Sequence, residues 1–310
     1  MLNIVKQLVS VAPRYGINEI KAVQIICQLL ENNHIVYEKQ MFNSAVPQIL
    51  EAKLQADGKE IPCIGSSLVS GEIKDGSYLI SSLGYVGEKH PYNICYSPIT
   101  DEISVVDIHR DEPSVTISRK DIIKIVMASK VNGYVKVKKT EFETANILIG
   151  NTINPDNLIF AHFDSIIGDG AMDNAAAVAV VLHTILQNPT LLNNNLFILA
   201  GNEEVSYDNY KSKSGFGFRV FESKYQKLLK NCKQVVVLDG VGIGKSQLVQ
   251  FGLDWVLQVR CLDQIKNKVW WLQNDQRKVL QYFHTKADTI ENLKLTYLEA
   301  AKSTLINKIR

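Results

Sequence analysis

The 310-residue sequence lacks the features that mark several common classes of protein. Its five cysteines lie far apart and form no CxxC pair, so neither a disulfide framework nor a cysteine zinc site is indicated. No segment reaches the roughly 18 consecutive apolar residues of a membrane span. The net charge is only +2 and the lysines are scattered, which argues against nucleic acid or a membrane surface as a partner.

The first residues also lack the pattern of an export signal. Residues 1–16, MLNIVKQLVSVAPRYG, contain an early lysine and a short apolar run but no small-residue cleavage site. The hydrophobic fraction of 46% and charged fraction of 21% are typical of a globular protein. We therefore expect a cytoplasmic protein with reduced thiols.

The spacing of apolar residues changes along the chain and predicts its organisation. Residues 2–12 and 17–33 have helical spacing, and residues 34–42 are typical of a strand. From about 45 to 138, short apolar runs are separated by Gly, Pro, Asp and Asn, which is typical of a small β-rich unit. From 139 onward, apolar strands alternate with helices.

Strands that are apolar throughout and separated by helices indicate a sheet covered on both faces. We predict an α/β fold in which a mixed sheet flanked by helices forms three layers. Residues 1–44 and 139–310 would form this domain, and the β-rich unit, residues 45–138, would be inserted into it.

The predicted strands of the second half end in side chains that bind metals or move protons. Because ligands in α/β sheets bind at the carboxyl ends of the strands, we expect these side chains to converge. In chain order the candidates are His162, Asp164, Asp173, Glu203, Glu204, Asp239 and His284.

Imidazole and carboxylate ligands together suit zinc or another first-row divalent ion. Two histidines with three carboxylates are more than one zinc ion needs. They would suit two ions that share a bridging carboxylate, roughly 3.5–4 Å apart. A further carboxylate beside the ions would remain to accept a proton from bound water.

Five motifs carry a resemblance to a known family: AHFDS, GAMDN, NEE, LDGVG and FHTKADT, in this order. They resemble the co-catalytic zinc aminopeptidases of the bacterial leucyl aminopeptidase and aminopeptidase Y type, which also include glutamate carboxypeptidase and the glutaminyl cyclases. The resemblance covers residues 139–310 well and the N-terminal helices more loosely. It implies a zinc exopeptidase fold of the phosphorylase/hydrolase-like kind, with a protease-associated-like unit inserted at 45–138.

The resemblance implies two Zn²⁺ ions per chain, with Co²⁺ or Mn²⁺ as alternatives. His162 and Asp239 would hold one ion, Glu204 and His284 would hold the other, and Asp173 would bridge the two.

The same resemblance implies roles beside the metals. Glu203 would be the general base, and Asp164 would fix the orientation of His162 through a hydrogen bond. The Asp173–Asn174 peptide bond would be cis.

We therefore predict a metallopeptidase, most simply an aminopeptidase that releases N-terminal residues from peptides. A peptide is the expected partner, and self-association into a homo-oligomer is left open. A carboxypeptidase, a deacylase and a one-zinc glutaminyl cyclase are alternatives on the same site, and a non-catalytic binding homologue is a third reading. The segment GNEEVSYDNY lacks the Gly-Leu-Gly run usual after the paired acids, so we predict no side-chain preference.

Overall fold

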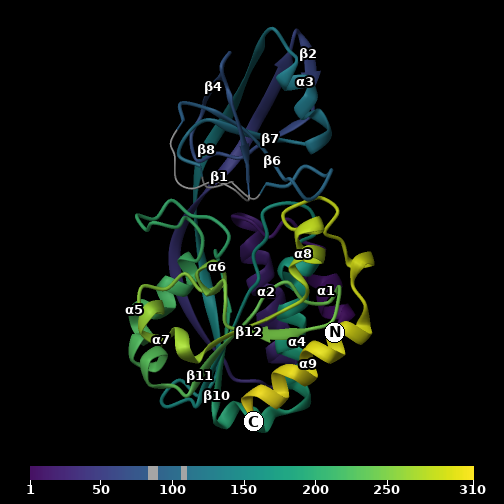
Figure 1. Cartoon of the computed structure of the whole chain (residues 1–310). Coiled ribbons are helices and arrows are strands. Elements are labelled where there is room, and N and C mark those ends of the chain that lie inside the picture. Colours follow the sequence, from purple (N-terminus) through teal and green to yellow (C-terminus); the bar gives the residue numbers. More distant parts are fainter. Residues whose placement is uncertain (83–89, 106–109) are drawn as a thin grey trace. The chain divides into compact units, whose positions relative to one another are not determined.

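The computed structural model in Figure 1 describes residues 1–82, 90–105 and 110–310. They form two compact units. The first unit comprises residues 1–44, 142–279 and 288–310, and the second comprises residues 45–141 and 280–287. Three elements contribute residues to both units: β1 (Glu38–Ala56), β8 (Val131–Gly150) and α8 (Gln276–Tyr282).

A mixed sheet forms the core of the first unit, as predicted. Its strand order is β12-β13-β11-β9-β10-β8-β1. Strand β9 pairs in parallel with β10 and with β11, and β11 pairs in parallel with β13. Strand β8 is antiparallel to β10, and β12 is antiparallel to β13. The remaining strands of this sheet are β9 (Asn157–His162), β10 (Asn195–Ala200), β11 (Gln234–Leu238), β12 (Gln247–Val249) and β13 (Val269–Gln273).

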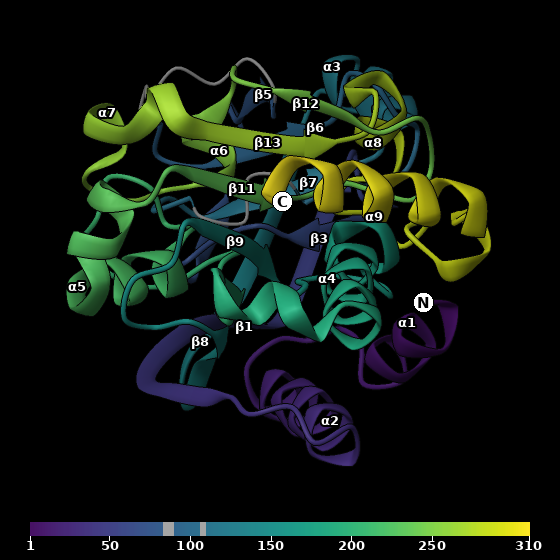
Figure 2. The ribbon, with the colours of Figure 1, turned by 90° about the horizontal axis from the view of Figure 1, so that it is seen from below.

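Helices cover both faces of this sheet, with α4 and α9 on one side and α5 on the other (Figure 2). Phe160 of β9 packs edge-to-face against Phe218 and Phe221 of α5, with ring centroids 5.5 and 5.2 Å apart. Helix α4 is apolar around its whole circumference and is almost entirely buried, as expected for the helix between the sheet and an outer helix. The predicted three-layer α/β fold is confirmed.

The helical segments of the first unit are α1 (Leu2–Val9), α2 (Ile17–Asn32), η2 (Ala171–Ala175), α4 (Ala176–Gln187), η3 (Pro189–Asn193), α5 (Phe216–Asn231), α6 (Leu253–Val256), α7 (Leu262–Ile265), η4 (Lys266–Lys268), η5 (Ile290–Asn292) and α9 (Leu295–Ile309). Within the described ranges, no helix has both the length and the apolar character needed to cross a bilayer.

Strand register brings the carboxyl ends of the parallel strands to one edge of the sheet. His162, the last residue of β9, pairs with Ala200, the last residue of β10. On the other side, Val237 of β11 pairs with Phe160. Residues that follow these three strands therefore emerge close together.

The second unit consists mainly of strands. One four-stranded sheet has the order β3-β7-β6-β5, while β2 pairs with β1 and β4 pairs with β8. Its apolar core includes Leu54, Ile94 and Val115. Its own elements are β2 (Lys59–Ile61), β3 (Cys63–Gly65), β4 (Gly71–Ile73), β5 (Tyr78–Ser81), β6 (Asn93–Tyr96), β7 (Ser114–Ile117), η1 (Arg119–Asp121) and α3 (Ile122–Val126).

Candidate metal centre

Buried acids and an imidazole follow the three parallel strands of the first unit. His162 ends β9, Glu203 and Glu204 follow β10, and Asp239 directly follows β11. His162 and both glutamates are buried, and Asp239 is half-buried. Apolar strands thus deliver polar side chains to one sheet edge, where they are shielded from water.

Three of the candidates predicted from the sequence bring possible ligand atoms close together. One possible ligand atom from each of His162, Asp173 and Glu204 lies within 4.8 Å of the others. His162 Nε2 lies 3.2 Å from Asp173 Oδ1 and 4.0 Å from Asp239 Oδ2. One imidazole with neighbouring carboxylates is a donor set that fits Zn²⁺.

Asp164 connects two of the candidate ligands. Its Oδ1 lies 3.3 Å from His162 Nδ1, and its Oδ2 accepts a hydrogen bond of 2.9 Å from the backbone N–H of Glu204. This carboxylate is fully buried. It therefore holds the imidazole from the side opposite Asp173 and fixes the chain at the start of Glu204.

The same carboxylates control the protonation of the imidazole. Burial opposes the charged form of His162, but the adjacent carboxylates of Asp164 and Asp173 outweigh it and raise the pKa of His162 well above its ordinary value. Without a metal, these two acids therefore favour the protonated form of the imidazole. A metal ion would take the place of that proton, because only the neutral imidazole is a ligand.

Glu203 has the environment expected of a carboxyl group that can hold a proton. Burial raises its pKa well above the ordinary value, and the charges of Glu204, Asp164 and Asp239 act in the same direction, while His162 opposes them. Several buried acids therefore lie near a single imidazole. A bound divalent cation would reduce the repulsion between their negative charges.

Asp173 is placed by a distorted turn at the start of α4. The Asp173–Asn174 peptide bond is cis, as the resemblance implied, and both residues depart from helical backbone angles. The Asn174 side chain donates a hydrogen bond of 2.9 Å to the carbonyl of Leu238, at the end of β11. This contact ties the Asp173 turn to the strand that precedes Asp239.

His284 belongs to the second unit. Its backbone carbonyl accepts a 2.9 Å hydrogen bond from the N–H of Val105, and its Nδ1 lies 3.3 Å from the carbonyl oxygen of Val105. The ring stacks on Phe283 with centroids 3.8 Å apart. Its role as a metal ligand stays a prediction from the sequence.

Comparison with protein families identifies the segment that carries most of these side chains. Residues 148–267 match the model of peptidase family M28. This segment is therefore similar to an M28 peptidase domain. The matched segment contains every candidate except His284. No curated protein matches the sequence.

Solved structures of low sequence identity share the fold. A zinc aminopeptidase from Bacillus subtilis superposes with a TM-score of 0.69 and 16% identity, over 98% of this chain and 92% of that chain. An aminopeptidase from Aneurinibacillus sp. strain AM-1 gives 0.64 and 17%, over 97% and 90%. A glutaminyl cyclase from an Acidobacteriales bacterium gives 0.55 and 13%, over 100% and 92%.

Two charged residues among the first 20 of the chain interact with these acids and were not among the candidates predicted from the sequence. Arg14 is fully buried and interacts through its charge with Asp164 and Asp173. Glu19 is fully buried, and its Oε1 accepts a 2.6 Å hydrogen bond from the Thr144 hydroxyl. No motif marks Arg14, but Glu19 lies on the buried face of α2, where a lone acid among apolar residues is a usable signal.

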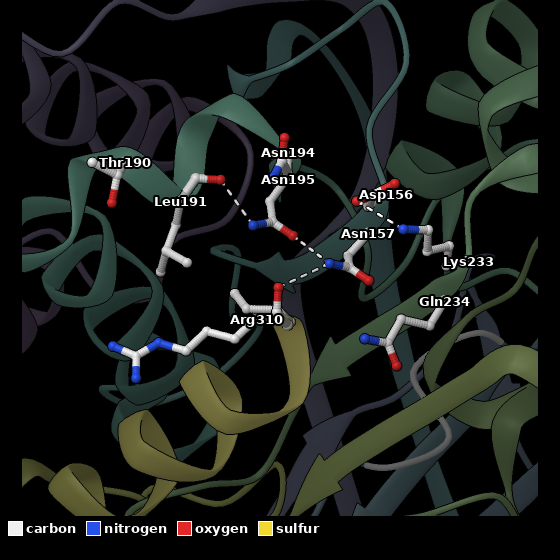
Figure 3. Close-up of a pocket in the computed structure, with 10 residues that line it drawn as sticks. Asp156, Asn157, Thr190, Leu191, Asn194, Asn195, Lys233, Gln234 and Arg310 are labelled. Atoms are coloured by element: carbon white, nitrogen blue, oxygen red, sulfur yellow. Dashed lines mark hydrogen bonds and ion pairs between the residues drawn. The ribbon is translucent and has the colours of Figure 1, made fainter.

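A pocket of about 620 Å³ lies at the opposite ends of the same strands (Figure 3). Asn157, the first residue of β9, is one of its lining residues and donates hydrogen bonds to Asn195 Oδ1 and to the carbonyl of Ile309. At about 3.3 Å per strand residue, Asn157 is roughly 17 Å from His162. This pocket therefore contains none of the candidate residues.

Proposed function

We propose that the protein is a zinc-dependent exopeptidase, and that it acts as an aminopeptidase on peptides. The observation that carries the proposal is the buried group of His162, Asp173 and Glu204, whose ligand atoms lie within 4.8 Å of one another at the carboxyl edge of an M28 domain. The aminopeptidases with the same fold support this choice.

We propose that this donor set holds two Zn²⁺ ions per chain, or Co²⁺ or Mn²⁺ in their place. His162 with Asp239 would hold one ion, Asp173 would be shared, and Glu204 would hold the second. His284 is the candidate from the sequence for completing the second ion's ligands. When bound, the metal supplies a Lewis acid for the peptide carbonyl and lowers the pKa of water.

The residues of this chain then handle the proton. Glu203 would accept it from the attacking water and return it to the leaving amine. The burial that raises the pKa of Glu203 favours a carboxyl group able to hold a proton between these two steps. Asp164 would keep His162 in the orientation required for binding, because it contacts the ring nitrogen on the side away from Asp173.

Substrates that differ only at their ends test the proposal. The purified protein, stripped of metal and then supplied with Zn²⁺, should release the N-terminal residue from members of a panel of aminoacyl arylamides, leucyl among them, and from the matching peptides with a blocked carboxyl end. The N-acetylated forms of both kinds of substrate should not be cleaved. No zinc-dependent release from any of these substrates would overturn the proposal.

Two other outcomes would indicate a different enzymatic activity at the same site. Cleavage only of peptides with a free carboxyl end would indicate a carboxypeptidase. Ammonia release from N-terminal glutaminyl peptides, with one zinc ion per chain, would indicate a cyclase. The cytoplasmic location and self-association stay predictions from the sequence.

A further inference from the structure

Asp288 holds the backbone of the turn that carries Asp173. Its Oδ1 accepts a 2.8 Å hydrogen bond from the N–H of Met172, and its Oδ2 accepts a 3.0 Å hydrogen bond from the N–H of Asp173. The backbone carbonyl of Asp288 also accepts from the N–H of Ala171, at 3.5 Å. Three successive N–H groups before the cis peptide therefore point at one residue.

Arg14 holds the preceding part of the same loop from the N-terminal segment. Its guanidinium donates to the carbonyls of Phe163, Asp169 and Gly170, at 2.5, 2.6 and 2.8 Å. Its backbone also forms two hydrogen bonds with Ser165. The N–H of Arg14 donates to Ser165 Oγ at 3.1 Å, and the N–H of Ser165 donates to the carbonyl of Arg14 at 3.0 Å. The planar fork thus fixes a loop of irregular backbone.

Both groups are costly to bury. Arg14 is fully buried and Asp288 is 2% exposed. Burial lowers the pKa of Arg14 and raises the pKa of Asp288 to about 7. Both groups form their hydrogen bonds with the backbone between His162 and Asp173. They therefore fix the separation of these two candidate ligands.

We propose that Asp288 is a positioning residue, which sets the backbone of Asp173 in its metal-binding place before the metal arrives. Arg14 supports it by anchoring residues 163–170. This inference rests on the metal centre of the proposed function. Neither residue lies in the segment matched to family M28, although Asp288 belongs to the FHTKADT motif.

The first unit contains a matched control for Asp288. Glu222 in α5 is equally buried, at 2%. Its carboxylate also accepts two successive backbone N–H groups, those of Arg260 and Cys261, both at 2.7 Å. Glu222 thus makes the same kind of contact as Asp288, but with a turn that contains no candidate ligand.

The experiment compares Asp288→Asn with Glu222→Gln. In each variant an amide group replaces one acceptor oxygen, so one backbone N–H loses its partner, and both metal-free proteins should lose similar stability in urea. Zinc affinity, measured by competition with a chromophoric chelator, should fall about 10–100-fold in Asp288→Asn and stay unchanged in Glu222→Gln. Added zinc should restore most of the activity of Asp288→Asn, which a purely structural defect would not show.

Arg14→Lys provides a second test if Asp288→Asn fails to fold. Lysine keeps the charge but cannot reach three carbonyls with one planar fork, so zinc affinity should again fall. Equal zinc affinity in the folded variants and the wild type would overturn the inference. Wild-type protein that binds zinc tightly but cleaves no peptide would instead refute the proposed function and leave the inference intact.

Discussion

Replacing Glu203 with glutamine keeps the shape of a buried side chain and removes the group proposed to accept the proton. The side chain is 7% exposed and follows β10, beside the candidate ligand Glu204. Loss of a general base slows a reaction by about 10²–10⁴-fold, which corresponds to about 3–5 kcal/mol of activation free energy. We expect kcat to fall by this factor at saturating zinc.

The same substitution should leave the stability of the metal-free protein unchanged or raise it. The acids Glu204, Asp164 and Asp239 surround Glu203 and raise its pKa together with burial. A neutral amide removes this repulsion, so the free energy of unfolding of the metal-free protein should be unchanged or higher, by about 1 kcal/mol. Zinc content should equal that of the wild type.

The assay is hydrolysis of a leucyl arylamide with zinc added, together with urea unfolding of the metal-free proteins. Glu222→Gln is the control for a buried acid outside the site, and it should keep the wild-type kcat. Unchanged activity in Glu203→Gln would remove Glu203 from the role of base. A loss of several kcal/mol in its unfolding free energy would show that Glu203 serves the fold.

Three further predictions concern folding. Burial raises the pKa of Glu19 well above its ordinary value of 4.5. The protonated Glu19 therefore contributes to the stability of the metal-free protein fully below pH 4.5, and this contribution is lost as the pH rises from 4.5 through the raised pKa. Glu19→Gln should remove a slope of up to about 1.4 kcal/mol per pH unit in urea unfolding, and an unchanged slope would contradict this. In Gly217→Ala, the new Cβ would lie 1.9 Å from the carbonyl oxygen of Gly201. This variant should cost about 1–3 kcal/mol, and an unaltered Tm would refute the close approach. Free zinc at about 100 times its Kd should stabilise the wild type by about 2.7 kcal/mol, and chelation should abolish the gain; identical melting with and without zinc would count against a metal centre.

The sequence predicted the layers of the first unit and the edge at which polar side chains meet. Strand β9 is apolar over residues 158–161 and helix α4 over residues 176–182. The alternation of such segments indicates a covered sheet without any knowledge of distant contacts. The expectation that candidates gather at the carboxyl ends of strands needs only the direction of each strand. His162, Asp173 and Glu204 do lie together.

Long strands that pass from one unit to the other were predicted less well. The strand expected at residues 34–42 is the start of β1, which runs from Glu38 to Ala56. Buried and exposed residues do not alternate regularly along this strand, so no single period describes it. Strand β13, with its two tryptophans, was not predicted as a strand, because a five-residue apolar run does not distinguish a strand from buried helix.

The hydrogen bonds that hold residues 163–173 could not be predicted from the sequence, although Asp288 itself lies in the FHTKADT motif. Arg14 and Asp288 reach the loop between His162 and Asp173 from opposite ends of the chain. Their partners are backbone groups, which carry no residue identity. Spacing along the sequence therefore gives no information about such contacts, and only the folded backbone reveals them.

A crystal of the protein grown with zinc, with anomalous scattering recorded at the zinc edge, tests the central claim most directly. The account predicts two peaks roughly 3.5–4 Å apart, with the carboxylate of Asp173 between them and with His162 and Glu204 on different ions. A map without zinc peaks beside these three side chains would contradict it.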